Sequence, residues 1–378
     1  MRCRHLELFA FHRHRAIFVR AGLALLLCVL SAGALAAAEL PDKTSKAIDD
    51  AIARVMRDKL IPGMSVALVV DQQIVSERGY GLADIENNVP ATPQSVYRLA
   101  SISKMLTGVA ALQLSEQGKL ELSAPIQRYV PTFPEKQAPI TAELLLKHQS
   151  GIRLYKDKET LSAIYYARVA GGLAIFQEDA LLFNPGEKFS YTTYGYNLLG
   201  CAIEGASGED YVTYVNDHVC APAGMKNIQP DNPYKIIPNR ASGYRRGLGG
   251  GADAILNAPM VDVSNKIPGG GWCSTAGDLA HFAIALADEK LLKRATLDRM
   301  WTAQKTTSGA PTPVGLGCFV KNAEGGKLVY HPGGQPKVST FLMLQPDRRT
   351  AVALMCNLQG APLQPLATEI VELLGKAK

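Results

Sequence analysis

The 378-residue sequence lacks several features that would assign it to a special class of protein. Aromatic residues make up only 7% of the chain and charged residues 20%, against 47% hydrophobic residues, which is typical of globular proteins and argues against bulk disorder. It has no Cys-x-x-Cys pair and no histidine-rich spacing, so we expect no structural zinc site. Nothing in it implies another metal or an organic cofactor. Beyond residue 38, no stretch is long and apolar enough to span a membrane.

The N-terminal residues have the pattern of a secretory signal peptide. Arginines precede an apolar run over residues 21–30, and small residues follow it. We expect residues 1–36 to be removed by cleavage after Ala36 or Ala38, and the exported protein to be periplasmic without stable membrane insertion. The alternative is an uncleaved anchor, because residues 21–38 could nearly span a bilayer.

Most of the positive charge belongs to this leader. Residues 1–36 contain five arginines and one glutamate, so their removal lowers the net charge from +6 to +2. A nearly neutral protein without a cluster of Lys and Arg is not typical of nucleic-acid binding, which favours small molecules or peptides as partners. Five cysteines remain, an odd number that leaves at least one free, and we interpret them as buried thiols with at most one disulfide. They are Cys201, Cys220, Cys273, Cys318 and Cys356.

Hydrophobic periodicity predicts an α+β fold in which both ends of the chain contribute to one antiparallel sheet. A helix over residues 44–60 precedes a hairpin of strands 64–70 and 74–79. Near the C-terminus, strands 327–331, 339–344 and 350–356 precede a helix over about 363–374. Between them lies mostly helical pattern, including 105–117, 142–147, 196–204 and 275–287. We therefore expect one domain over 39–378, with an α/β lobe (about 39–100 and 315–378) and an inserted helical lobe (about 101–314).

A glycine-rich stretch over residues 247–251 superficially suggests a nucleotide-binding loop. It follows no convincing strand and opens no clear helix, which is the context that such a motif requires. We interpret it as a mobile surface loop.

Ser101 and Lys104 form the first motif that could carry chemistry. Ser101 lies where an extended segment turns into the helix over 105–117, and residues three apart on a helix share a face. A serine hydroxyl is a weak nucleophile that needs an adjacent base, and a lysine can serve if burial and its neighbours keep it neutral. The helix start could also supply a backbone N–H to an oxyanion. Alone, Ser-x-x-Lys indicates only the start of a helix.

Two later segments could complete such a site. Tyr191 lies in an aromatic loop over 183–196 and could relay a proton to Ser101 if Lys104 polarises its phenol; alternatively, these tyrosines only pack. Residues 330–334, Tyr-His-Pro-Gly-Gly, stand at the end of a predicted strand. Their glycines would allow close approach of a substrate, although a strand ending in a turn explains them equally well.

Together, the three segments resemble the serine β-lactamases and penicillin-binding DD-peptidases, which carry Ser-x-x-Lys, Tyr-x-Asn and Lys-Thr-Gly or His-x-Gly in this order. Residues 144–152, 183–200 and 269–276 further resemble the branch related to class C β-lactamases, and the likeness covers about residues 45–375. It implies Ser101 as nucleophile, Lys104 as base, Tyr191 as relay and His331 in the third motif. It also implies oxyanion donors at Ser101 and Gly334, a substrate-binding Gly333, and a structural His148 that supports the turn at Ser150–Gly151.

Two departures from this pattern bear on the substrate. Thr193 replaces the asparagine that contacts the substrate acyl chain in the family, and offers only a short hydroxyl. His331 replaces a lysine, so the permanent charge that would pair with a β-lactam carboxylate is lost or made pH-dependent. We therefore expect a peptidase for D-amino-acid peptides, or an esterase or amidase. The alternatives are a true β-lactamase and a non-catalytic binding or scaffold protein. Loops over 154–178 and 231–266 are expected to set specificity.

Overall fold

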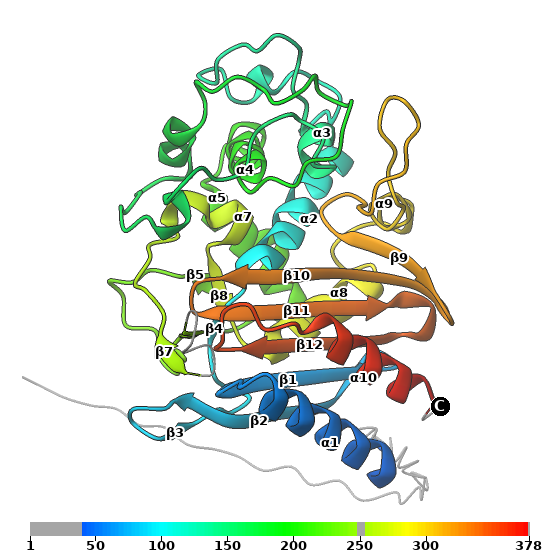
Figure 1. Ribbon diagram of the computed structural model, residues 1–378. Helices are drawn as coiled ribbons and strands as arrows, with labels where there is room; N and C mark the ends of the chain where they lie inside the picture. The colour runs from blue at the N-terminus through cyan, green and yellow to red at the C-terminus, as the bar shows by residue number, and fades with distance from the viewer. Residues whose placement is uncertain (1–39, 248–253, 377–378) are drawn as a thin grey trace, which may run out of the picture. The chain divides into compact units, whose positions relative to one another are not determined.

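The computed structural model describes residues 40–247 and 254–376, which belong to one compact unit (Figure 1). The predicted signal peptide and most of the glycine-rich stretch lie outside these residues. Within them, no helix is long and apolar enough to cross a membrane. The five cysteines of the described chain are all buried and free, which agrees with their interpretation as buried thiols.

A seven-stranded antiparallel sheet joins the two ends of the chain, as the sequence predicts. Its strand order is β3-β2-β1-β12-β11-β10-β9. Strand β1 pairs with β12 over the whole of its length except its first residue, with Met64 opposite Cys356, so the N-terminal hairpin and the C-terminal strands form one sheet. The strands are β1 (Gly63–Val70), β2 (Gln73–Asp84), β3 (Val89–Pro90), β9 (Phe319–Ala323), β10 (Gly326–Gln335), β11 (Val338–Gln345) and β12 (Thr350–Cys356).

Helices cover both faces of this sheet (Figure 1). Helices α1 (Asp42–Asp58) and α10 (Gln364–Lys376) pack together on one face, where residues such as Ile52 and Ile370 meet the apolar side chains of β1 and β12. Helix α8 (Ala276–Ala287) covers β1 and β12 on the other face. Because both faces are covered, every residue of β11 and β12 is buried.

Helix α8 lies within the stretch that the sequence assigns to the helical lobe, yet it packs on the sheet. Thr275 caps its N-terminus: the Thr275 hydroxyl accepts a hydrogen bond of 3.2 Å from the backbone N–H of Asp278. The other helices of this stretch are α2 (Ser103–Glu116), α3 (Ala142–Leu146), α4 (Tyr194–Ser207), α5 (Tyr211–Val215), α6 (Ala221–Ala223), α7 (Ile267–Gly270) and α9 (Arg294–Met300). Its short strands are β5 (Gln229–Pro230), β6 (Tyr244–Arg246), β7 (Ile255–Asn257) and β8 (Trp272–Ser274), and strand β4 (Tyr97–Arg98) lies just before it.

Strand β10 is longer than predicted. The Pro-Gly-Gly sequence does not end it: His331 lies inside the strand, which continues opposite β11 as far as Gln335. On its other side, β9 pairs with β10 only up to Tyr330, so residues 331–335 have a free outer edge. Proline cannot donate to a ladder and is tolerated where its nitrogen faces such an edge. Since backbone orientation alternates along a strand, the N–H of Gly334 then faces the same free edge as the nitrogen of Pro332.

The docking of the C-terminal helix can be tested by truncating one buried side chain. Ile370 has no exposed surface, so Ile370→Ala is expected to lower the free energy of unfolding by about 2–5 kcal/mol through lost burial and a residual cavity. The exposed neighbour Glu372 provides the control, because Glu372→Ala should change it by less than about 0.5 kcal/mol. Urea unfolding measures both; equal effects of the two variants would contradict this packing.

Candidate active site

Ser101 lies in a sharp turn between strand β4 and helix α2. The turn begins at Ala100, whose φ of +48° is left-handed and unfavourable for a residue with a side chain. The preceding residue holds the turn in place: the Leu99 N–H donates to the Trp272 carbonyl (2.7 Å), and its carbonyl accepts from the Thr340 hydroxyl (2.9 Å). A 3₁₀ turn, Ala100–Ile102, then leads into α2. Ser101 is therefore at a helix start, where backbone N–H groups lack helical acceptors.

Lys104 is fully buried, and its amine has three neighbours. The Nζ atom lies 3.2 Å from Ser101 Oγ, 3.2 Å from Thr193 Oγ1 and 2.6 Å from the Gly269 carbonyl oxygen. Burial, and then the nearby charge of Lys266, hold the pKa of Lys104 well below its ordinary value. A neutral amine has two N–H groups and one lone pair. The Gly269 and Thr193 oxygens can accept the two N–H groups, which leaves the lone pair for the proton of Ser101.

Tyr191 reaches the same point from the loop before α4. Its ring centroid is 4.8 Å from Lys104 Nζ, and its phenol interacts with the hydroxyl of Ser101. Burial raises the pKa of Tyr191 well above its ordinary value, and the Ser101 hydroxyl only partly opposes that rise. Tyr191 therefore remains a protonated phenol at neutral pH. The structure brings together the three side chains that the sequence proposes as nucleophile, base and relay.

His148 supports the loop that carries Tyr191. Its Nδ1 accepts a hydrogen bond of 3.1 Å from the Thr192 N–H, and its carbonyl accepts one of 2.9 Å from the Ser190 N–H. Its ring lies against Tyr191, with centroids 4.4 Å apart. Burial, followed by the charges of Lys104 and His331, lowers the pKa of His148 well below its ordinary value. A neutral histidine in this position fixes the Tyr191 loop and does not act as a base.

His331 carries no charge at physiological pH. Its side chain is 1% exposed, its ring packs edge-on against Phe319, and its Nδ1 donates to the carbonyl of Pro332 (2.7 Å). Burial, and then the charge of Lys104, lower the pKa of His331 to about 3. The sequence leaves two outcomes for a histidine in place of the family's lysine: the positive charge is lost, or it depends on pH. A pKa this low corresponds to loss of the charge. His331 also makes no hydrogen bond with Ser101, Lys104 or Tyr191.

The two glycines after Pro332 occupy different environments. A Cβ at Gly333 would come within 2.5 Å of the Leu99 carbonyl and 2.0 Å of Thr340 Oγ1, so a glycine is needed there to let β10 pack beneath the Ser101 turn. This packing explains Gly333 better than the substrate contact expected of it. A Cβ at Gly334 would meet no atom within 4 Å, so the backbone there is open. Its N–H, on the free edge of β10, can form an oxyanion hole with that of Ser101.

The Thr193 hydroxyl lies next to the Lys104 amine. The residue is 3% exposed, and its hydroxyl contacts both Lys104 and the phenol of Tyr155. It therefore helps to orient the amine.

Sequence reasoning missed two residues beside this cluster, the buried Lys266 and the partly buried Tyr155. Lys266 is 2% exposed, and its Nζ lies 4.8 Å from the ring centroid of Tyr155. Burial first, and the charge of Arg98 second, lower the pKa of Lys266 to about 8, although Asp262 opposes the shift. Both residues belong to the loops expected to set specificity, where no periodic pattern signals that a side chain is buried. Among the described residues, no group of three or more His, Cys, Asp or Glu could hold a metal ion.

The sequence matches the family described as Beta-lactamase over residues 48–375. The human protein named "Serine beta-lactamase-like protein LACTB, mitochondrial" is 29% identical, over 85% of this chain and 78% of its own length. Protein flp of Staphylococcus aureus (strain MW2) is 26% identical, over 85% of this chain and 64% of its own.

Solved structures show the same fold. The octameric penicillin-binding protein homologue from Pyrococcus abyssi has a TM-score of 0.75 and 25% identity, and the superposition covers 88% of this chain and 77% of that protein's chain. The D-amino acid amidase from Ochrobactrum anthropi SV3, in complex with D-phenylalanine, has a TM-score of 0.74 and 23% identity. Its superposition covers 88% of this chain and 98% of the amidase chain. Because the family match spans nearly the whole described chain, the protein belongs to the beta-lactamase family.

Proposed function

We propose that this member of the serine β-lactamase-like hydrolases forms an acyl-enzyme on Ser101 and cleaves the amide or ester bonds of small substrates, with D-amino-acid peptides or amides as the favoured class. The observation that carries the proposal is the contact between Ser101 Oγ and the buried amine of Lys104 at 3.2 Å. A serine hydroxyl becomes an effective nucleophile only beside a base of this kind.

The contacts support one sequence of proton transfers. Lys104 takes the proton of Ser101 as Oγ attacks the substrate carbonyl, and the oxyanion that forms is held by the N–H groups of Ser101 and Gly334. The Tyr191 phenol donates its proton to the leaving amine and recovers one from the Lys104 ammonium. The C–N bond breaks, which leaves the acyl group on Ser101. Water then attacks the ester, gives its proton back through the same groups, and restores the Ser101 hydroxyl.

The loss of charge at His331 favours amides, esters or peptides without a carboxylate beside the scissile bond over β-lactams. A β-lactamase substrate presents a carboxylate next to the reactive ring, and a histidine with a pKa of about 3 offers it no positive charge. The grouping of Ser101 and Tyr191 around the buried Lys104 argues in turn against a purely non-catalytic binding or scaffold role. A fully buried lysine without a carboxylate partner is costly, and a binding protein would have no use for it.

The nucleophile can be tested with a fluorophosphonate probe. Ser101→Ala is expected to abolish labelling of the protein, because within the described residues the neutral amine of Lys104 contacts only two hydroxyls, and the other one, Thr193, is a buried threonine. Ser103→Ala is the matched control: that hydroxyl is also buried at the start of α2 but has no hydrogen-bond partner, so its removal should leave labelling intact. Labelling that persists in Ser101→Ala would place the nucleophile elsewhere.

Hydrolysis assays on the wild-type protein test the substrate class, with the same two variants as controls. We expect the wild-type protein to hydrolyse a D-Ala-D-Ala peptide, a D-amino-acid amide or a nitrophenyl ester, and to turn over a chromogenic cephalosporin slowly or not at all. Ser101→Ala should lose this hydrolysis, and Ser103→Ala should keep it. Rapid cephalosporin turnover would instead favour a true β-lactamase.

The pH dependence of labelling tests the role of Lys266. Its positive charge disfavours protonation of Lys104, so Lys266→Met should raise the pKa of Lys104 and move the acidic limb of the labelling rate to higher pH. Lys266→Arg keeps the charge and should leave that limb close to its wild-type position. Because the pKa of Lys266 is about 8, the wild-type protein should follow Lys266→Arg below that pH and approach Lys266→Met above it. Identical pH profiles for both variants would show that this charge does not reach Lys104.

A further inference from the structure

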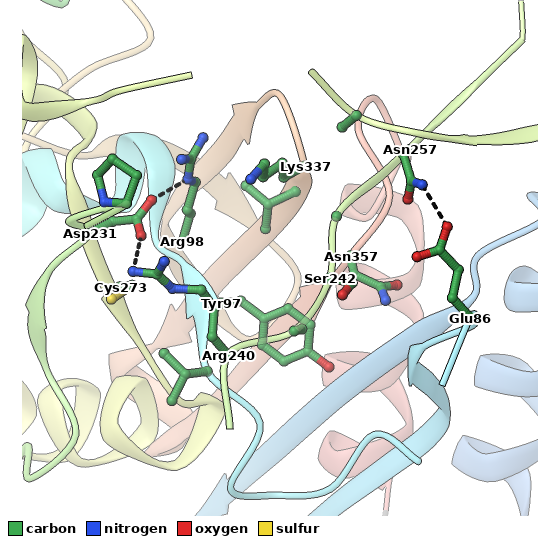
Figure 2. A pocket seen from close by; sticks show the side chains of 16 residues that line it. Glu86, Tyr97, Arg98, Asp231, Arg240, Ser242, Asn257, Cys273, Lys337 and Asn357 are labelled. Carbon is green, nitrogen blue, oxygen red and sulfur yellow. Dashed lines mark hydrogen bonds and ion pairs between the residues drawn. The ribbon is translucent and has the colours of Figure 1, made fainter. Parts of the chain in front are cut away.

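A second polar site lies beside the turn that joins β10 to β11. It is a cavity of about 330 Å³, whose lining includes Arg98 of β4 and Lys337 of the turn (Figure 2). None of Ser101, Lys104 and Tyr191 lines it. It is nevertheless near them along the chain, because Arg98 is three residues before Ser101 and Lys337 three residues after Gly334. The cavity therefore begins near the end of the free edge of β10.

Positive charge exceeds negative charge in this cavity. Figure 2 shows Arg98, Asp231 and Arg240 on one side of it, and Glu86 with Asn257 on the other. Arg98 Nε and Arg240 (2.8 Å) both pair with Asp231, so one carboxylate serves two guanidinium groups. The third cation is Lys337, which forms no ion pair or hydrogen bond with any residue that the structure describes.

Most other polar groups of the lining are already occupied. The Tyr97 hydroxyl is 3.1 Å from Ser65 Oγ, and the Ser242 hydroxyl donates to Asp84 (3.0 Å). The Asn357 amide bonds the backbone of Gly63 and Leu82, and the Asn257 amide donates to Glu86 (2.8 Å). The donors left over are the ammonium of Lys337 and part of the Arg240 guanidinium. A ligand that matches them must accept hydrogen bonds and carry negative charge.

The local backbone holds Lys337 in this place. Its φ of +83° is left-handed, and a Cβ on Gly243 would overlap the side-chain stem of Lys337 at 2.1 Å, so a glycine is needed to accommodate the lysine. Burial, followed by the charge of Arg98, lowers the pKa of Lys337. The charge of Asp231 opposes this shift, but that carboxylate already pairs with two guanidinium groups. A half-buried cation without a carboxylate of its own, on strained backbone, is unfavourable in the unliganded protein, and an anion would relieve part of that cost.

We propose that this cavity binds a carboxylate of a small molecule, with Lys337 and Arg240 as the anchoring cations. The carboxylate can belong to the distal part of a peptide substrate that extends along β10, in which case the inference rests on the proposed function. It can also belong to a separate effector. The volume is at the lower end of the range for ligand pockets and suits a group of this size.

Binding is measured by calorimetry on the Ser101→Ala protein, so that the result does not depend on turnover. N-acetylglutamate is the probe, and its uncharged diamide is the chemical control. We expect the probe to bind and Lys337→Gln to weaken its binding by about tenfold, the loss of one charge-assisted hydrogen bond. Lys290→Gln removes an exposed lysine next to α8 and should have no effect. No binding of the probe, equal binding of its diamide, or equal binding by both variants would overturn the proposal.

The source of the carboxylate is then distinguished on the protein with Ser101 intact. If saturating N-acetylglutamate slows fluorophosphonate labelling, the bound molecule reaches the cleft, and the substrate is the source. If the labelling rate is unchanged, the site serves a separate effector; either result supports a carboxylate site. If the protein is not labelled at all but still binds N-acetylglutamate in calorimetry, the proposed acyl-enzyme is wrong and the proposed carboxylate site is still supported.

Discussion

Lys104 is an amine that the fold must keep uncharged, and much of the surrounding structure follows from this constraint. A buried ammonium would be strongly unfavourable without a carboxylate, and none contacts Lys104 among the described residues. The fold supplies neutral oxygens instead, from Thr193 and Gly269, which match the two N–H groups of a neutral amine. Helix α2 is itself almost entirely buried, so the base stands on one of the most rigid elements of the protein. A carboxylate in place of either oxygen would restore the charge and remove the base.

The site depends on both the helical segments and the sheet. The helical segments provide Lys104 and Tyr191, but only the sheet provides a strand with an unpaired edge next to Ser101. That edge exists because β9 stops opposite Tyr330 while β10 continues. Pro332 is compatible with β10 only because one side of the strand is free, and Gly333 lets the strand approach the Ser101 turn. A full-length β9 would satisfy these backbone groups and close the oxyanion hole.

The sequence predicts the terminal helices and the five long strands well, because their apolar residues alternate or repeat with clear periods. It fails where strand pairing or tertiary packing overrides a local signal. His-Pro-Gly-Gly is typical of a turn, yet it continues as a strand because it pairs with β11, and the chain turns only after Gln335. The neutral state of His331 and the burial of Lys266 are likewise invisible in the sequence, since desolvation depends on elements that meet only in the fold. Family resemblance supplied the order of the motifs, but not these charge states.

The distribution of charge separates chemistry from recognition. Around Ser101, the groups that titrate are held neutral: the amine of Lys104, the phenol of Tyr191 and the imidazoles of His148 and His331. A proton can move among neutral groups without a fixed charge that favours one position. A nearby cation, such as Lys266, makes protonation of Lys104 more costly and so helps to keep the amine neutral. The guanidinium groups near Asp231 and the ammonium of Lys337 line a separate cavity, to which Ser101, Lys104 and Tyr191 do not contribute. An anionic group can therefore be recognised there without disturbing the base.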